Sequence, residues 1–173
     1  MPITIRPETA ADLDAIDAVT LAAFHQHPHH APGAPVTEHV IIRRLREAGA
    51  LSLSLVAEQA GQIVGHCSFS PIRIQHQPSD WLVLAPVSVL PSLQSQGIGS
   101  QLIRAGLQPL RERGVPGVVV LGEPAYYQRF GFHAQHQLEP DGAPQEFFFA
   151  LPLQAGGASA LPQGSVQFHA AFA

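Results

Sequence analysis

The spacing of apolar residues predicts two helices near the start of the chain. Between residues 9 and 24, and again between residues 37 and 49, apolar side chains recur every three or four positions, as on the buried face of a helix. A short alternating run at residues 3–6 predicts a strand before the first helix. The expected buried residues are Leu13, Ile16, Val19, Ala23 and Phe24 in the first helix, and Val40, Ile41 and Leu45 in the second.

The middle of the chain carries three runs that favour β-structure. Residues 51–59 and 62–74 are rich in β-forming side chains, and the Ala60-Gly61 pair between them predicts a hairpin. Residues 81–90 are apolar at almost every position, as in a strand covered on both faces. Pro86 lies in this run and cannot donate a ladder hydrogen bond, so we expect a bulge or a local separation from a neighbouring strand.

The second half alternates helices and strands. We expect a helix at residues 99–114, kinked or divided at Pro109, and a short aromatic helix at residues 125–130. Strands are expected at residues 118–121, 146–151 and 166–168. The order of elements predicts an α/β chain with a mixed sheet and helices on both faces. The length of 173 residues fits a single domain, residues 1–173.

Composition excludes several classes of protein. Nine Lys and Arg against thirteen Asp and Glu give a net charge of −4, without the basic footprint of a nucleic-acid-binding protein. No apolar run approaches the roughly 20 residues that span a bilayer, and the first residues do not resemble a signal peptide. We therefore expect a cytoplasmic protein that binds neither nucleic acid nor membrane. The single cysteine, Cys67, is expected to be a core residue rather than a nucleophile.

A glycine-containing turn follows the apolar run and precedes a predicted helix. It reads Gln94-Ser95-Gln96-Gly97-Ile98-Gly99-Ser100. Backbone amides at such a turn point outwards, and the helix N-terminus adds a partial positive charge, so the segment suits a pyrophosphate. Neither a Walker A loop nor a full dinucleotide fingerprint is present. An ordinary tight turn at a helix start is the alternative.

A second segment, residues 122–132, holds both tyrosines of the chain directly after a buried strand. Open α/β sheets bind their ligands at the carboxyl ends of strands, where a tyrosine can donate a proton or a hydrogen bond. The alternative is that Tyr126, Phe130 and Phe132 are core aromatics.

These two segments resemble the GNAT superfamily of acetyl-CoA-dependent N-acyltransferases. Its coenzyme loop reads Gln/Arg-x-x-Gly-x-Gly/Ala, matched here by Gln94, Gly97 and Gly99, and its later motif Tyr-x-x-x-Gly-Phe is matched from Tyr127 to Phe132. Residues 64–71, 87–91 and 121–124 are similar to its YhbS-like bacterial branch. The resemblance implies the acyl-CoA N-acyltransferase fold, with a mostly antiparallel sheet, splayed middle strands and helices on both faces.

The resemblance also implies roles for individual residues. Amides of Gln94, Ser95, Gln96, Gly97, Ile98, Gly99 and Ser100 would bind the pyrophosphate of acetyl-CoA, and backbone groups of Val87, Ser88 and Val89 would pair with its pantetheine arm. Tyr127 would protonate the departing thiolate after direct attack by a primary amine. Glu123 is the first candidate for the general base, with a helix cap as its alternative. Glu58 and His66 are the weaker candidates, and a water chain could serve instead of a base residue.

Two rival functions and a histidine-rich segment complete the sequence hypotheses. A non-catalytic acyl-CoA-binding sensor or partner-binding module is the main rival, and a Rossmann-like nucleotide-binding protein is the more distant one.

A proline-rich stretch contains four histidines, His25, His27, His29 and His30. No carboxylate or thiol neighbours them, so we expect no metal site there. In the superfamily this loop lies near the acceptor entrance, which favours a part in substrate selection. Homodimers are frequent in the superfamily, so the resemblance allows one here.

Overall fold

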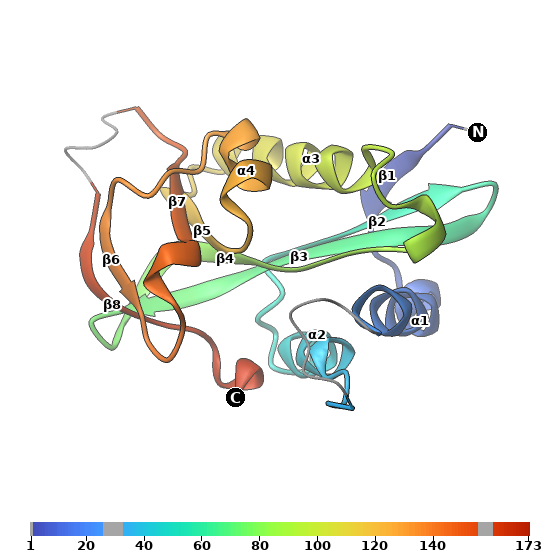
Figure 1. Cartoon of the computed structure of the whole chain (residues 1–173), viewed down its shortest axis with the longest axis horizontal. Helices are drawn as coiled ribbons and strands as arrows, with labels where there is room; N and C mark the ends of the chain where they lie inside the picture. Colours follow the sequence, from blue (N-terminus) through green and yellow to red (C-terminus); the bar gives the residue numbers. More distant parts are fainter. Residues whose placement is uncertain (1, 26–32, 156–160) are drawn as a thin grey trace. The chain divides into compact units, whose positions relative to one another are not determined.

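The chain forms two compact units, each assembled from two separate stretches of sequence. The computed structural model describes residues 2–25, 33–155 and 161–173 (Figure 1). Unit 1 comprises Met1–Ser68 with Pro86–Gly106, and unit 2 comprises Phe69–Ala85 with Leu107–Ala173. Two long strands and one helix run from one unit into the other. The single-domain organisation stays a prediction.

Among the described residues, eight strands form a mixed sheet, and four α-helices accompany them. The strands are β1 (Thr4–Pro7), β2 (Leu53–Gln59), β3 (Gln62–Ile74), β4 (Gln77–Val89), β5 (Gly117–Leu121), β6 (Gln137–Pro140), β7 (Phe148–Pro152) and β8 (Gln163–Gln167). The helices are α1 (Leu13–Phe24), α2 (Glu38–Glu47), α3 (Ile98–Glu112) and α4 (Pro124–Tyr127). Short 3-10 turns include η2 (Pro91–Leu93), η3 (Gln128–Phe130) and η6 (Ala170–Phe172).

In unit 1 the strands follow the order β1-β2-β3. Strand β1 pairs antiparallel with β2, and β2 turns directly into β3. The two turn residues, Ala60 and Gly61, have φ values of 52° and 79°, as the tight hairpin turn requires. The predicted hairpin is therefore confirmed.

Helices cover both faces of the unit 1 sheet. On one face, side chains of α1 and α2 pack against Val56 of β2 and Ile63 of β3. On the other, the Cβ of Ala57 and the side chain of Leu102 in α3 meet at Gly65, where an added Cβ would lie 3.0 Å from Leu102 Cδ1. Because neighbouring residues of a strand point to opposite faces, Val56 and Ala57 define the two sides. The expected arrangement of helices on both faces is confirmed (Figure 1).

The buried face of α2 differs from the sequence prediction by one position. Ile42 and Leu45 are fully buried, whereas Val40 and Ile41 are only half-buried. Ile42 joins Ile16 and Val19 of α1 in the core of unit 1. Ile42 and Leu45 are three positions apart and therefore lie on the same face of the helix, which is the face that packs into the core.

In unit 2 the order is β3-β4-β5-β7, and β8 pairs with both β3 and β6. Strands β4 and β5 run parallel, with partners only at Leu82↔Val118 and Val83↔Val119. Strand β5 continues to Leu121, where it pairs with β7, and β4 also continues beyond Val83. The two middle strands therefore pair only over a short stretch, as splayed strands would.

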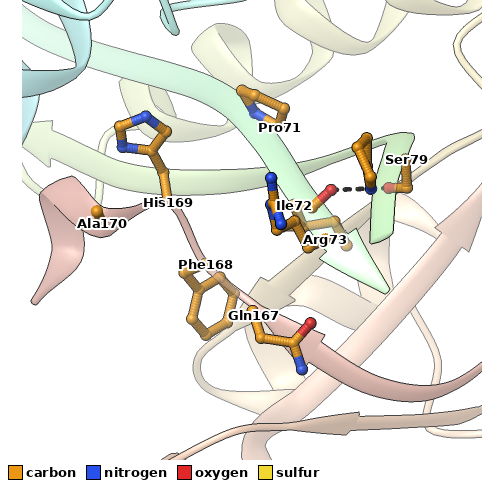
Figure 2. Close-up of a pocket in the computed structure, with 9 residues that line it drawn as sticks. Pro71, Ile72, Arg73, Ser79, Gln167, Phe168, His169 and Ala170 are labelled. Carbon is orange, nitrogen blue, oxygen red and sulfur yellow. Dashed lines mark hydrogen bonds between the residues drawn. The ribbon is translucent and has the colours of Figure 1, made fainter. Parts of the chain in front are cut away.

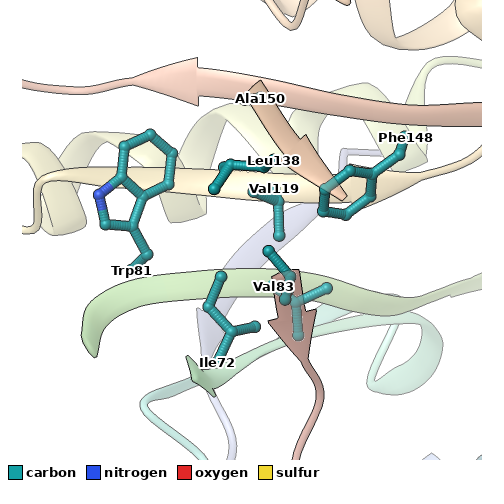
Figure 3. Packing of buried hydrophobic residues seen from close by; sticks show 8 residues of the cluster. Ile72, Trp81, Val83, Val119, Leu138, Phe148 and Ala150 are labelled. Carbon is teal, nitrogen blue, oxygen red and sulfur yellow. The ribbon is translucent and has the colours of Figure 1, made fainter. Parts of the chain in front are cut away.

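The core of unit 2 contains Trp81, Val83, Val119 and Phe148 (Figure 3). The indole ring of Trp81 lies directly on Gly117, because an added Cβ there would come within 2.3 Å of the ring. A larger residue at position 117 would collide with this ring, so glycine is needed there for the one tryptophan of the chain to pack against β5.

Two features depart from the sequence prediction. Strand β4 begins at Gln77 rather than at residue 81, because a hairpin turn at Gln75 and His76 joins it to β3. Both turn residues have positive φ values, 52° and 63°, without the glycine or asparagine that usually marks such turns.

Helix α3 is a single helix that runs through Pro109, with Leu107 and Leu110 buried on either side. Burial of this stripe outweighs the hydrogen bond that proline cannot donate.

Candidate functional site

The glycine-containing turn connects β4 to α3 in unit 1, as expected. Residues 94–97 are exposed, and Ser95 and Gly97 have φ values of 64° and 85°. Gln94 fixes the start of the turn, because its side-chain Nε2 donates to the Val89 carbonyl oxygen at 3.1 Å. The buried side chain of Ile98 anchors the start of the helix. An exposed backbone is thus held between two fixed ends.

The backbone amides of this turn have no carbonyl partner within the described part of the chain from residue 95 to residue 100. The next amide, that of Gln101, donates to the Gly97 carbonyl at 3.0 Å. An added Cβ at Gly97 would meet nothing within 4 Å, so the space beside the turn is open. Unpaired amides at the N-terminus of a 15-residue helix are suited to binding an anion.

The last residues of β4 direct their backbone groups to opposite edges. The Ser88 carbonyl oxygen lies against Gly65 of β3, 3.2 Å from the position of an added Cβ, and the Leu90 amide donates to Val64 of β3. Because backbone groups alternate along a strand, those of Val87 and Val89 point to the edge away from β3. Coenzyme pairing by Val87, Ser88 and Val89 stays a prediction, and Val87 and Val89 are the two of the three whose backbone groups point to that edge. The Ser88 hydroxyl is buried and has no hydrogen-bond partner among the residues that the structure describes.

In unit 2, Tyr127 ends α4, which follows β5 after two residues. Its ring lies on Gly122, because an added Cβ there would come within 2.3 Å of Tyr127 Cε2. Edge-on contacts with Tyr126 and Phe132, at centroid distances of 5.0 and 5.9 Å, hold the ring from two further sides. Phe132 is buried, whereas Tyr126 and Tyr127 are half-buried. The core-aromatic interpretation therefore applies fully to Phe132 and only in part to Tyr126.

Glu123 occupies the N-cap position of α4, but its side chain makes no capping hydrogen bond. Instead its backbone carbonyl accepts from the Tyr126 and Tyr127 amides, each at 3.2 Å. The residue is exposed. The cap interpretation of its carboxylate thus has no support in the geometry, while its backbone helps to fix Tyr127.

The two weaker base candidates, Glu58 and His66, are each engaged with other side chains. Glu58 lies 3.6 Å from Arg6 in an ion pair. His66 is fully buried, and its Nε2 is hydrogen-bonded to Ser54 Oγ at 2.8 Å. Ser54 donates in turn to Glu8, whose carboxylate accepts from Arg46 Nε at 2.8 Å. Burial lowers the pKa of His66 to about 4, so its imidazole is neutral at neutral pH.

This buried histidine predicts an acid-sensitive stability. The pKa of His66 is about 4 in the folded protein and near 6.5 in the unfolded chain, so the unfolded chain binds the proton first as the pH falls. The contribution of neutral His66 to the free energy of unfolding is therefore present above pH 6.5 and is lost as the pH falls from 6.5 to about 4. Between pH 7 and 5 we expect the free energy of unfolding to fall by about 2 kcal/mol from this residue. Urea unfolding of the wild type and of His66→Gln at both pH values measures it; equal pH dependence in the two proteins would contradict the assignment.

Cys67 is a core residue, as expected from the sequence. It is fully buried, its sulfur donates to the Leu102 carbonyl at 3.8 Å, and burial raises the pKa of its thiol to about 12. A thiol with this pKa is not a nucleophile at neutral pH.

The metal hypothesis concerns residues that lie partly outside the described structure. His27, His29 and His30 fall there, and of the four only His25 is described. Across residues 2–25, 33–155 and 161–173, no three His, Cys, Asp or Glu side chains gather as metal ligands would. None of the helices in the same ranges is long and apolar enough to cross a membrane.

Comparisons with known proteins give a consistent result. The model of the acetyltransferase (GNAT) family matches residues 17–132. The uncharacterized N-acetyltransferase YhbS of Escherichia coli K12 is 35% identical over 171 residues, which cover 97% of each chain. A GNAT family acetyltransferase from Brucella melitensis, solved in complex with acetyl-CoA, is 42% identical with a TM-score of 0.85 over 99% of each chain.

The structure of E. coli YhbS in complex with CoA has a TM-score of 0.87 and 33% identity over 98% of this chain and 91% of that one. The matched residues include the turn at 94–100 and the tyrosine motif at 127–132. From the two motifs, the mixed sheet and these relatives together, the chain belongs to the acetyltransferase (GNAT) family, a family of acyltransferase enzymes.

Proposed function

We propose that this protein transfers an acetyl group from acetyl-CoA to a primary amine. The observation that carries the proposal is the run of unpaired amides at residues 95–100, at the N-terminus of α3. A pyrophosphate needs several converging donors and a positive local potential, and this turn offers both. The Brucella relative, which is 42% identical, was solved with acetyl-CoA.

The pantetheine arm would extend along β4 in this proposal. Val87 and Val89 direct backbone groups to the edge away from β3, and these groups would pair with the amides of the arm as an added strand would. The short pairing of β4 with β5 supports this proposal, because an arm needs room beside β4.

Tyr127 would act as the general acid. The neutral amine nitrogen attacks the thioester carbonyl carbon, a carbon–nitrogen bond forms and the carbon–sulfur bond breaks. The departing sulfur takes the proton of the Tyr127 hydroxyl, and the tyrosine regains a proton from solvent. The fixed ring position over Gly122 supports this role, since a proton donor must be held in one place.

Glu123 would accept the proton that the attacking amine loses, directly or through water. Its position after β5 and its exposure support this role. Glu58 is less suited because Arg6 pairs with it, and His66 because it is fully buried. Direct attack needs no cysteine intermediate, in agreement with the inert Cys67.

Thiol release from acetyl-CoA in the presence of an amine panel tests the proposal. The panel contains polyamines, amino acids, aminoglycosides and peptides with free N-termini or lysines. At least one amine is expected to give turnover well above the rate of acetyl-CoA hydrolysis, with the acetylated product identified by mass spectrometry. Tight acetyl-CoA binding without turnover on any amine would instead favour the non-catalytic acyl-CoA-binding module, and failure to bind acetyl-CoA would overturn both.

A further inference from the structure

Unit 2 contains a pocket of about 560 Å³ that the proposed acetyl transfer does not use. It lies between the end of β3, the start of β4 and the segment from β8 into η6 (Figure 2). None of its lining residues belongs to the turn at 94–100 or to the motif at 122–132. The volume falls within the range of small-molecule sites, about 300–1,000 Å³.

The apolar part of the pocket is preformed. Pro71 of β3 and Pro78 of β4 contribute rigid rings, and Phe168 contributes an aromatic wall. Phe168 is held by ring contacts with Phe148 and Phe172, at centroid distances of 6.4 and 5.8 Å. A wall that does not rearrange on binding costs little ordering entropy.

Two of the polar lining residues already have their hydrogen-bond partners. Ser79 Oγ donates to the Ile72 carbonyl at 2.9 Å and accepts from the Trp81 amide at 3.2 Å. The side-chain Oε1 of Gln167 accepts from the His76 backbone amide at 2.8 Å, and its side-chain Nε2 donates to Asp141 Oδ2 at 2.7 Å. These two residues join the strands and leave little capacity for a ligand.

Arg73 and His169 retain donors. Arg73 donates one bond, to the His76 carbonyl at 3.2 Å, and in the described part of the chain no carboxylate lies within ion-pair distance of it. His169 Nδ1 accepts from the Ala171 amide at 3.0 Å, so the proton of the neutral ring resides on Nε2. The pocket thus offers a guanidinium and an imidazole N–H, which are both donors, beside an apolar wall.

We propose that this pocket binds an aromatic carboxylic acid of low molecular mass, with Arg73 and His169 as donors to its carboxylate and Phe168 beside its ring. An unpaired guanidinium binds a carboxylate through two parallel hydrogen bonds, and an aromatic ring packs on the proline and phenylalanine surfaces. An amine or a neutral sugar lacks the negative charge that complements Arg73. The proposal does not depend on the acetyl transfer.

Binding of phenylacetate to the full chain without acetyl-CoA tests the proposal, with phenylacetamide as the neutral probe of the same shape. By NMR titration, phenylacetate is expected to bind at least tenfold more tightly than phenylacetamide. Arg73→Gln should abolish this preference, while Arg44→Gln, which removes an exposed cation on α2, should retain it. His169→Asn should weaken phenylacetate binding, since an asparagine oxygen can replace the Nδ1 acceptor but not the Nε2 donor.

Three results would overturn the proposal. They are equal affinity for the two probes, unchanged binding in Arg73→Gln, and equally tight binding of inorganic phosphate, which would make the apolar wall irrelevant. The variant Gly97→Glu separates this site from the coenzyme site. It should lose acetyl-CoA and keep phenylacetate, so failure of one proposal is distinguishable from failure of the other.

Discussion

Replacing Tyr127 by phenylalanine is expected to lower kcat by roughly 10²–10⁴, the usual contribution of a general acid. A departing thiolate develops negative charge on sulfur, and a phenol with an ordinary pKa near 10 is protonated at neutral pH and able to donate. Phenylalanine keeps the ring on Gly122 and its contacts with Phe132, so packing and coenzyme affinity should change little. Steady-state kinetics with the identified amine, together with acetyl-CoA binding, measure both quantities.

Tyr126→Phe is the matched control, because this neighbouring ring makes similar aromatic contacts and precedes Tyr127 in the same short helix. It should leave kcat within a few-fold of the wild type. If Tyr127→Phe were equally active, the assignment of the acid would be wrong. Glu123→Gln gives a different signature, since loss of a base is compensated as rising pH deprotonates the amine, whereas loss of the acid is not.

Gly97→Glu is expected to abolish stabilisation by acetyl-CoA. At a ligand concentration of 100 Kd, binding stabilises a protein by about 2.7 kcal/mol. For a chain of this size that corresponds to a Tm rise on the order of 5–10 °C. The glutamate would place its charge beside the unpaired amides of residues 95–100, where the pyrophosphate binds in our proposal. Thermal unfolding with and without acetyl-CoA measures the shift.

Gly97→Ala separates charge from backbone strain. Gly97 has φ = 85°, so any side chain there costs about 1–2 kcal/mol, and both variants share this cost. The alanine variant should have a lowered Tm but a retained response to acetyl-CoA, because an added Cβ meets nothing within 4 Å. A full response in a folded Gly97→Glu protein would show that the coenzyme phosphates bind elsewhere.

The elements that the sequence predicts well are those with local signals. The hairpin at Ala60-Gly61 follows from a two-residue turn between β-rich runs, and the turn at 94–100 from its position between an apolar strand and a helix. The alternation of strands and helices was sufficient for the mixed sheet, and the two motifs for the family. Apart from that alternation, each of these signals spans a few adjacent residues.

Features that depend on distant residues were not predicted. The hairpin at Gln75 and His76 carries no turn signal, and it is held by β8 instead: the Gln75 amide donates to the Ser165 carbonyl at 2.7 Å. The link from His66 through Ser54 to Glu8 joins residues from three strand regions. No local pattern reports such pairs, because they meet only after the strands have assembled.

The interleaved chain path has a consequence for synthesis on the ribosome. Unit 1 is complete in sequence once Gly106 has been made, whereas unit 2 still lacks β7 and β8. Until those strands emerge, the apolar strand β5 has no β7 partner, and the end of β3 at Arg73 and Ile74 has no β8. Open strand edges recruit other chains. The nascent protein is therefore most prone to aggregation over its last third, and a stalled or truncated chain that ends before residue 163 keeps that liability permanently.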